Sequence, residues 1–328
     1  MSLNSTFSSS ALVLDGADGL PSLVDDLDLA STFSLAEKSA ATLKAYRSDA
    51  EVFDAWCRSR GILQPLPSSA DVIAAFLAAE ARRGVKASTI GRRAAAIRYA
   101  HRASGLEDPT QNESVRRVLR GIRRTLGSSA HQKAPATAEV IAAMISHCPR
   151  TLTGIRDRAL LAFGFAGAFR RSEIAALDVS DLDFLAEGVR VRIRRSKTDQ
   201  EGAGQEVAIP HGRSIKPVDA LRQWLDAAGI EDGAVFRPIS RSQNVRGAKR
   251  LTPVSIARII KAYAHEAGFE ASEFSGHSLR AGFVTTAADR GANETQIMEV
   301  TRHKDLRTVR TYIRRANLFK GTPGHRFL

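Results

Sequence analysis

The second half of the chain carries six polar residues whose types suit chemistry on a phosphodiester. They are Arg170, Lys197, His277, Arg280, His303 and Tyr312. Guanidinium and ammonium groups bind charged phosphate oxygens, imidazoles transfer protons, and a phenol oxygen is a nucleophile. The sequence around them has no cluster of carboxylates with metal-ligand spacing. If the six groups meet in space, they predict phosphodiester cleavage by Tyr312 without a metal.

Each of these residues also has a common structural explanation. Arg170 and Glu173 have the spacing of a local ion pair where two helices join. Lys197 is typical of a solvated loop lysine, and His277 of a residue that caps a helix. Tyr312 lies beside an apolar helix stripe and is consistent with simple packing. Their joint order and spacing therefore carry the functional interpretation.

Charge indicates the kind of partner. The chain of 328 residues has a net charge of +13. Residues 1–40 contribute −5, so the remainder carries +18. Such a basic body favours a polyanion, above all nucleic acid, over a merely solvated cationic surface.

Cysteine content and hydropathy bear on the compartment. The two cysteines, Cys57 and Cys148, are too few for a disulfide framework and fit a reducing cytosol. The longest apolar run, Ala159–Phe169, is too short to span a bilayer, and no secretory signal is visible. The sequence predicts a soluble, cytoplasmic protein.

The length of the chain predicts two domains. Residues 1–30, rich in Ser, Asp and Gly, predict a disordered acidic tail. Helical periodicity over residues 31–126 predicts an all-helical domain, and residues 127–136 have the composition of a linker. Residues 137–328 predict a second, mostly helical domain.

The second domain has one segment with a different period. Val189–Arg195 alternates apolar and basic residues, which indicates a strand, and Glu206–Pro210 predicts a second strand. The predicted fold class is mainly α, with a helical N-terminal DNA-binding domain. A mixed, mostly helical catalytic domain with a small antiparallel sheet follows it.

Basic residues of the first domain recur at helical spacing. In the predicted helix Glu113–Leu126, four arginines follow one face, opposite an apolar face. A solvated face normally intersperses both charge signs, so clustering of one sign favours phosphate contact. The predicted DNA contacts are Lys44, Arg47, Lys86, Arg92, Arg93, Arg116, Arg120, Arg123 and Arg124.

From about residue 35 to its end, the chain resembles the tyrosine recombinase (phage integrase) family. Arg170 and Glu173 match the family's Arg-x-x-Glu box, and Lys197 matches its hairpin lysine. His277-x-x-Arg280 matches the second box, and His303 and Tyr312 match the later histidine and the nucleophile. One departure stands before His303, because Arg302 occupies a position where the wider family commonly has glycine.

The resemblance implies a mechanism without a cofactor, metal or ATP. Tyr312 attacks the scissile phosphate to form a 3′-phosphotyrosine and a free 5′-hydroxyl. Arg170 and Arg280 clamp the non-bridging oxygens, and Lys197 protonates the leaving oxygen. The remaining roles are His277 as base or orienter of the tyrosine, His303 as a hydrogen-bond donor to the phosphate, and Glu173 as a supporting residue.

The resemblance also implies a partner and an assembly. The partner is double-stranded DNA with an inverted-repeat site, and the working form is a tetramer on two such sites. Two alternatives stay open at this point. One is an enzyme of the same chemistry, such as a type IB topoisomerase or a telomere resolvase. The other is a non-catalytic DNA-binding regulator of the same fold.

Overall fold

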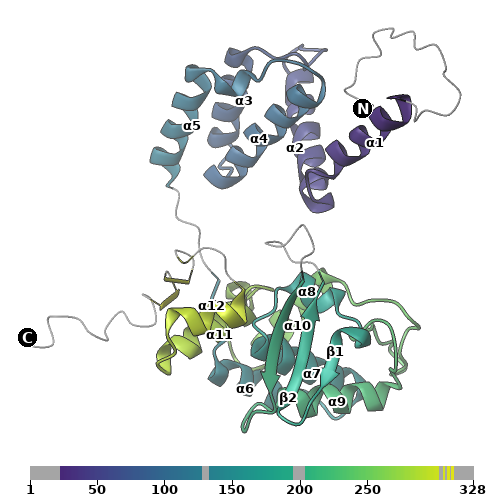
Figure 1. Ribbon diagram of the computed structural model, residues 1–328. Helices are drawn as coiled ribbons and strands as arrows, with labels where there is room; N and C mark the ends of the chain where they lie inside the picture. The colour runs from purple at the N-terminus through teal and green to yellow at the C-terminus, as the bar shows by residue number, and fades with distance from the viewer. Residues whose placement is uncertain are drawn as a thin grey trace, which may run out of the picture. The chain divides into compact units, whose positions relative to one another are not determined.

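The computed structural model describes residues 23–127, 133–194 and 204–302, together with residues 306, 309, 310, 312 and 313. The chain divides into two compact units, residues 1–130 and 131–328 (Figure 1). Among the described residues, no helix has the length and apolar character needed to cross a membrane.

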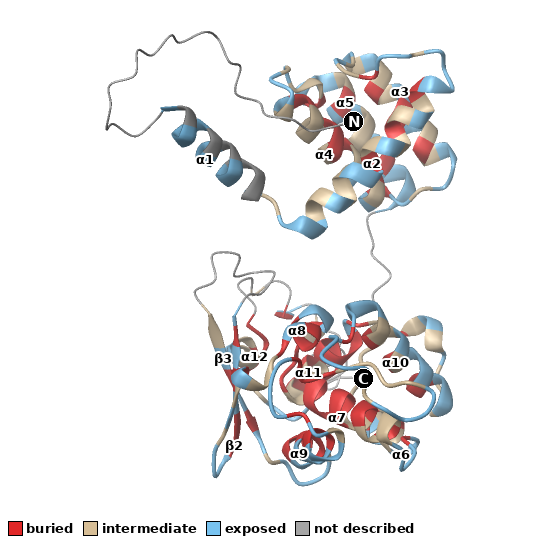
Figure 2. Ribbon diagram, turned by 90° about the vertical axis from the view of Figure 1, so that its right-hand side faces the viewer, coloured by how far each residue is buried: buried red, intermediate tan, exposed pale blue. Residues whose placement is uncertain are grey.

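The first unit is helical. Phe53, Ile73, Phe76 and Ile90 form its buried core, contributed by three different helices, as the red segments in Figure 2 indicate. The Ser69 hydroxyl caps one helix by accepting a hydrogen bond from the Val72 N–H. The helices are α1 (Leu23–Ala36), α2 (Ala40–Arg58), α3 (Ala70–Arg82), α4 (Ala87–Ala103) and α5 (Glu113–Leu126).

Helix α1 departs from the prediction of a disordered tail up to residue 30. It begins at Leu23, so the last eight residues of that predicted tail are helical. Two features favour a helix there. Asp25 and Asp26 lie in the first turn, where negative charge interacts favourably with the helix dipole, and Leu23 and Leu27 are one turn apart. Both leucines are exposed.

The second unit combines helices with a three-stranded antiparallel sheet in the order β1-β2-β3. Its helices are α6 (Ala138–Ser146), α7 (Leu152–Ala166), α8 (Arg171–Ala176), α9 (Pro217–Ala228), α10 (Pro253–Glu266), α11 (Ser278–Asp289) and α12 (Glu294–Thr301). Its strands are β1 (Leu182–Phe184), β2 (Gly188–Ile193) and β3 (Gln205–Pro210). The predicted fold class, mainly α with a small antiparallel sheet, is confirmed.

Alternation in β2 places its apolar side chains on one buried face. Val189, Val191 and Ile193 are buried, and Val191 pairs with Val207 across the sheet. Helix α9 lies against β3, and α7 packs beside α9 in the core (Figures 1 and 2). Strand β1 was not predicted, because three residues are too few for alternation to be recognised.

The segment before α6 is bound to the second unit. The Ala134 and Ala136 N–H groups donate to the carbonyl oxygens of Glu273 and Ser278 at 2.8 and 2.9 Å. A Cβ at Gly282 would lie 1.7 Å from the Ala136 oxygen, so only glycine permits this approach. Residues 133–136 were predicted to be part of a linker, but these hydrogen bonds fix them beside α11; residues 128–132 lie outside the described residues.

Candidate active site and DNA-binding surface

Arg170 and Glu173 form a reciprocal pair at the start of α8. The Arg170 N–H donates to Glu173 Oε2 at 2.9 Å, and the Arg170 guanidinium donates to Glu173 Oε1 at 2.6 Å. Both side chains are buried. A buried carboxylate is stable when it is paired and hydrogen-bonded, and this one also fixes the direction of Arg170.

Arg280 reaches the same place from α11. Its guanidinium donates to the carbonyl oxygen of Ala168 at 3.0 Å. Ala168 lies in the turn between α7 and Arg170 and has a left-handed backbone with φ of 47°. The two predicted phosphate-binding arginines are therefore brought together around one turn.

Burial and neighbouring charge depress the pKa of Arg280. Burial is the largest cause, followed by the positive charges of Arg170 and Arg302, and together they lower the pKa to about 9. Glu173 and Tyr312 act in the opposite direction. A cationic group held in this way is stabilised by an added anion such as a phosphate.

His277 and Arg280 are divided between surface and interior. His277 precedes the first residue of α11 and is exposed, whereas Arg280 is buried. The start of α11 lies close to α8, because a Cβ at Gly276 would be 2.4 Å from Cδ of Arg171. Glycine at this position lets the two parts of the site approach.

Tyr312 lies on a helical segment that includes Val309 and Ile313. It packs against the buried cluster that contains Val284 and Ile297. Val284 belongs to α11, the helix that carries Arg280, so Tyr312 packs against that helix. The other two predicted catalytic residues, Lys197 and His303, lie outside the described residues.

Arg302 is a buried member of the cluster that the sequence marked only as a departure from the family pattern. Its guanidinium donates to Glu173 Oε2 at 2.8 Å. It also lies over the Phe169 ring, 5.2 Å from the ring centroid. The only sign of this role in the sequence was an arginine at a position where glycine is common. That sign did not indicate which residues the side chain contacts.

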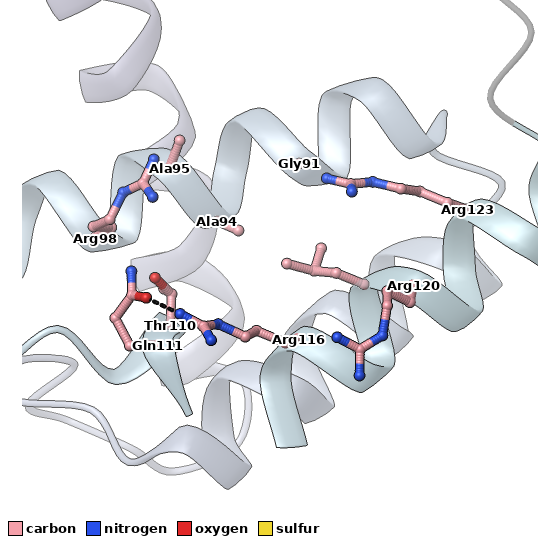
Figure 3. A pocket seen from close by; sticks show the side chains of 10 residues that line it. Gly91, Ala94, Ala95, Arg98, Thr110, Gln111, Arg116, Arg120 and Arg123 are labelled. Atoms are coloured by element: carbon pink, nitrogen blue, oxygen red, sulfur yellow. Dashed lines mark hydrogen bonds between the residues drawn. The ribbon is translucent and has the colours of Figure 1, made fainter. Parts of the chain in front are cut away.

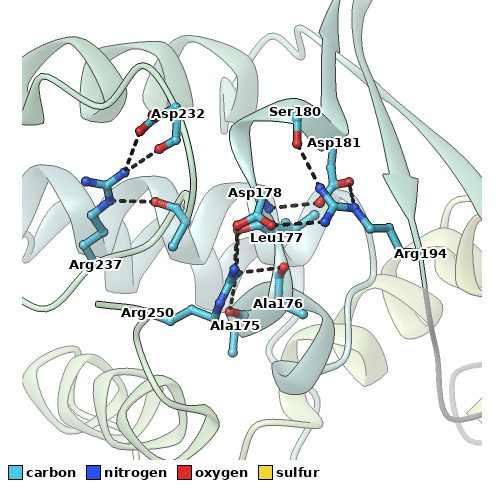
Figure 4. Close-up of polar contacts among 11 residues, drawn as sticks. Ala175, Ala176, Leu177, Asp178, Ser180, Asp181, Arg194, Asp232, Arg237 and Arg250 are labelled. Atoms are coloured by element: carbon cyan, nitrogen blue, oxygen red, sulfur yellow. Dashed lines mark hydrogen bonds and ion pairs between the residues drawn. The ribbon is translucent and has the colours of Figure 1, made fainter. Parts of the chain in front are cut away.

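A polar network holds the other end of α8 (Figure 4). The Arg250 guanidinium donates to the Ala176 carbonyl at 2.9 Å and pairs with Asp178 at 2.6 Å. Arg194, the residue after β2, pairs with Asp178 at 3.2 Å and with Asp181 at 2.6 Å. Helix α8 is thus held at both ends, and the end of β2 is fixed to the same carboxylates.

A cationic cleft lies between α4 and α5 in the first unit. It has a volume of about 450 Å³, and its arginines come from both helices (Figure 3). Arg116 hydrogen-bonds to Gln111, and Arg120 pairs with Glu113 at the start of its own helix. The arginines that line the cleft are Arg98, Arg116, Arg120 and Arg123.

The other predicted DNA contacts differ in exposure. Arg93 is largely buried and pairs with Glu80 and Asp49, so its charge is neutralised inside the domain. Arg92 is half exposed and makes two hydrogen bonds to Asp49 at 2.7 and 3.0 Å. The remaining predicted contacts are exposed: Lys44, Arg47, Lys86, Arg116, Arg120, Arg123 and Arg124.

Solved structures of recombinases share this fold. The XerH site-specific recombinase bound to its palindromic difH substrate aligns with a TM-score of 0.61 and 15% identity, over 91% of this chain and 84% of that one. The Tn1549 transposon integrase bound to transposon right end DNA aligns with a TM-score of 0.60 and 13% identity, over 90% and 97%. At these identities the likeness is one of fold.

Sequence comparisons extend the likeness to curated relatives. An integrase/recombinase XerD homologue from Selenomonas ruminantium is 40% identical over 87% of this chain and 85% of its own length. The Cre recombinase of Escherichia phage P1 is 24% identical over 84% of each chain. Residues 136–318 match the phage integrase family, and residues 31–104 match its N-terminal SAM-like domain. This chain belongs to the phage integrase family of tyrosine recombinases, the enzymes of site-specific DNA recombination.

Proposed function

We propose that this enzyme cuts and rejoins DNA through a covalent 3′-phosphotyrosine at Tyr312, without a metal or ATP. The observation that carries the proposal is the meeting of Arg170 and Arg280 at the turn around Ala168, with Tyr312 packed against the cluster that contains Val284 of α11. Guanidiniums suit this role because they present several N–H donors to phosphate oxygens in a planar fork.

In the proposed cleavage step, the phenol oxygen of Tyr312 forms a bond to phosphorus as the bond from phosphorus to the 5′ oxygen breaks. The phenol proton passes to a base, and the leaving oxygen gains a proton. His277 and His303 are proposed as the base and a phosphate hydrogen-bond donor, and Lys197 as the acid. Arg170 and Arg280 stabilise the charge that grows on the non-bridging oxygens.

The energy of the broken bond is kept in the phosphotyrosine. A 5′-hydroxyl from another strand therefore restores the phosphodiester and releases the phenol with no energy input, which is why ATP is not required. The guanidiniums supply the positive charge that a metal supplies in other phosphoryl-transfer sites. The proposed reaction is balanced by the chain's own groups and the two DNA ends.

The proposed partner is double-stranded DNA with an inverted-repeat site, bound by residues 31–126 and cut by residues 137–328. The arginines of the cleft between α4 and α5 support phosphate contact by the first domain. Arg93 is left out of the proposed interface because Glu80 and Asp49 already neutralise it. A tetramer on two sites is the proposed assembly.

A recombination assay with a selected site tests this function. The full chain is used to select its binding site from a random duplex library, and two copies of that site are placed on one plasmid. The protein is expected to delete the intervening DNA in buffer containing EDTA and no nucleotide, and Tyr312→Phe to bind the site without deleting it. If the wild-type protein binds the site but never recombines it, the result supports a non-catalytic DNA-binding regulator. If it relaxes supercoiled plasmid without regard to the site, the result supports a type IB topoisomerase.

A further inference from the structure

Arg302 occupies a backbone conformation that disfavours any residue with a side chain. It follows the last residue of α12 with φ of 58° and ψ of 39°, in the left-handed region. Glycine is the usual residue at such a helix end, and other residues cost about 1 kcal/mol or more there. An arginine at this position implies that contacts of its side chain offset this conformational cost.

The Arg302 side chain is almost fully enclosed by the turn that precedes Arg170. It is 6% exposed. One terminal nitrogen donates to the carbonyl oxygens of Gly167 and Val300 at 3.3 and 3.1 Å. The guanidinium also lies on the Phe169 ring, so it contacts the turn from two sides.

Glu173 lies between two guanidiniums. Its Oε1 accepts from Arg170 at 2.6 Å, and its Oε2 accepts from Arg302 at 2.8 Å. Arg302 therefore shares the negative charge of Glu173 with Arg170. The Arg170 guanidinium is bound to Glu173 through one of its terminal nitrogens. A guanidinium has five N–H donors in a planar fork, so this bond to Glu173 uses only part of the donor set of Arg170.

Arg280 meets Arg302 at the same backbone atom. The Ala168 carbonyl oxygen accepts from Arg280 at 3.0 Å and from Arg302 at 3.5 Å. The turn that presents Arg170 is therefore held by two arginines from α11 and from the end of α12. A change at Arg302 acts on both phosphate-binding arginines at once.

We propose that Arg302 is a positioning residue of the phosphate-binding pocket. It neutralises Glu173 and fixes the turn at residues 167–169, so that Arg170 and Arg280 are oriented for one phosphate. This inference rests on the proposed cleavage function. Arg302 itself is not a catalytic residue, because it acts through Glu173 and the turn.

Single-turnover cleavage of a nicked duplex carrying the selected site tests the inference. Arg302→Met keeps much of the side-chain volume and removes the charge, and it should slow formation of the covalent adduct about 100-fold, the scale of a misplacement by about 1 Å. Arg302→Lys should restore part of this loss. Arg302→Gly relieves the backbone conformation and should cleave as slowly as Arg302→Met. Site affinity should change less than about threefold, because this pocket is a small part of the DNA contact.

The pH dependence separates positioning from a general loss of stability. Arg302 is one of the causes that hold the pKa of Arg280 at about 9, after burial and Arg170. Removing its charge raises that pKa. Loss of the Arg280 charge is expected to lower the second-order rate constant for adduct formation at alkaline pH. This decline should therefore move to higher pH in Arg302→Met, although the rate constant itself is lower than in wild type. A destabilised protein would lose activity at a lower pH instead.

A double variant covers the case in which Arg302→Met folds poorly. In a Glu173→Gln background no carboxylate is left buried beside the lost cation, so Arg302→Met should cost less than about fivefold there, a non-additive result. The inference is overturned if Arg302→Met and Arg302→Gly cleave within about threefold of wild type. It is equally overturned if their rates follow the folded fraction and the alkaline decline does not move. Failure of wild type to form the adduct contradicts the proposed function instead.

Discussion

Glu173 binds both the backbone N–H and the guanidinium of Arg170, one on each carboxylate oxygen. The two residues are separated by less than one turn of α8, so the start of the helix and the direction of the arginine are set together. Arg302 completes the arrangement from the far end of the unit's sequence. The buried carboxylate is thus shared by two buried guanidiniums, each of which has an anionic partner.

The stability of this pair can be measured directly. Glu173→Gln leaves two buried guanidiniums without their carboxylate and should lower the free energy of unfolding by about 3 kcal/mol, the scale of a broken buried pair. Urea denaturation gives the value. Glu299→Gln on α12 is exposed and should change stability by less than about 0.5 kcal/mol. Equal stability of the two variants would contradict the structural role of Glu173.

The arginines of the α4–α5 cleft should set the salt dependence of DNA binding. Each phosphate contact contributes about −0.9 to the slope of log affinity against log salt concentration. Arg123→Ala should reduce the magnitude of that slope by about one unit and weaken all sequences alike. Arg58→Ala, which removes an arginine already paired with Asp54, is the matched control and should leave the slope unchanged. Identical slopes for all three proteins would exclude the cleft from the DNA interface.

Arg93 should act on stability instead of DNA affinity. Its guanidinium pairs with Glu80, whose side chain is fully buried, and with Asp49. Arg93→Met should lower the free energy of unfolding by about 1–3 kcal/mol, because Glu80 and Asp49 each lose one cation while Arg83 and Arg92 stay paired with them. Thermal or urea unfolding checks this. A variant that keeps wild-type stability and loses DNA affinity would return Arg93 to the DNA-contact set.

Patterns that act along the chain were predictable from the sequence. Helix α5 was predicted with the bounds that the structure has, because Asn112 caps its start and a left-handed Gly127 follows its end. Strands β2 and β3 were placed to within two residues by alternation and turn composition. The fold class followed from these local signals.

Contacts between distant segments were not predictable. Arg93 was predicted to contact DNA from its spacing on α4. That spacing does not reveal its two acidic partners, which lie on α2 and α3. Arg302 was recognised as unusual, but its partner Glu173 lies 129 positions away. The convergence of Arg170 and Arg280 was expected from the family resemblance, whereas the shared turn at Ala168 was not.

The buried thiol of Cys148 predicts a pH-dependent stability. Burial is the largest cause that raises its pKa from 9.0 to about 11, and the negative charge of Asp157 adds to it. The folded state therefore favours the protonated thiol, and this contribution is present below pH 9 and is lost as the pH rises towards about 11. The stability difference between wild type and Cys148→Ser, measured by urea denaturation, should shrink across that interval. A constant difference would contradict the raised pKa.

Covalent capture of DNA tests the central claim most directly. A suicide duplex with a nick near the scissile phosphate lets the short 5′-hydroxyl fragment diffuse away after cleavage and traps the adduct. Wild type should give an SDS-resistant complex whose DNA-bearing peptide contains Tyr312, attached at a 3′-phosphate. Tyr312→Phe should bind the same duplex with unchanged affinity and give no complex. A trapped complex with the Tyr312→Phe protein, or attachment through another residue, would contradict the account.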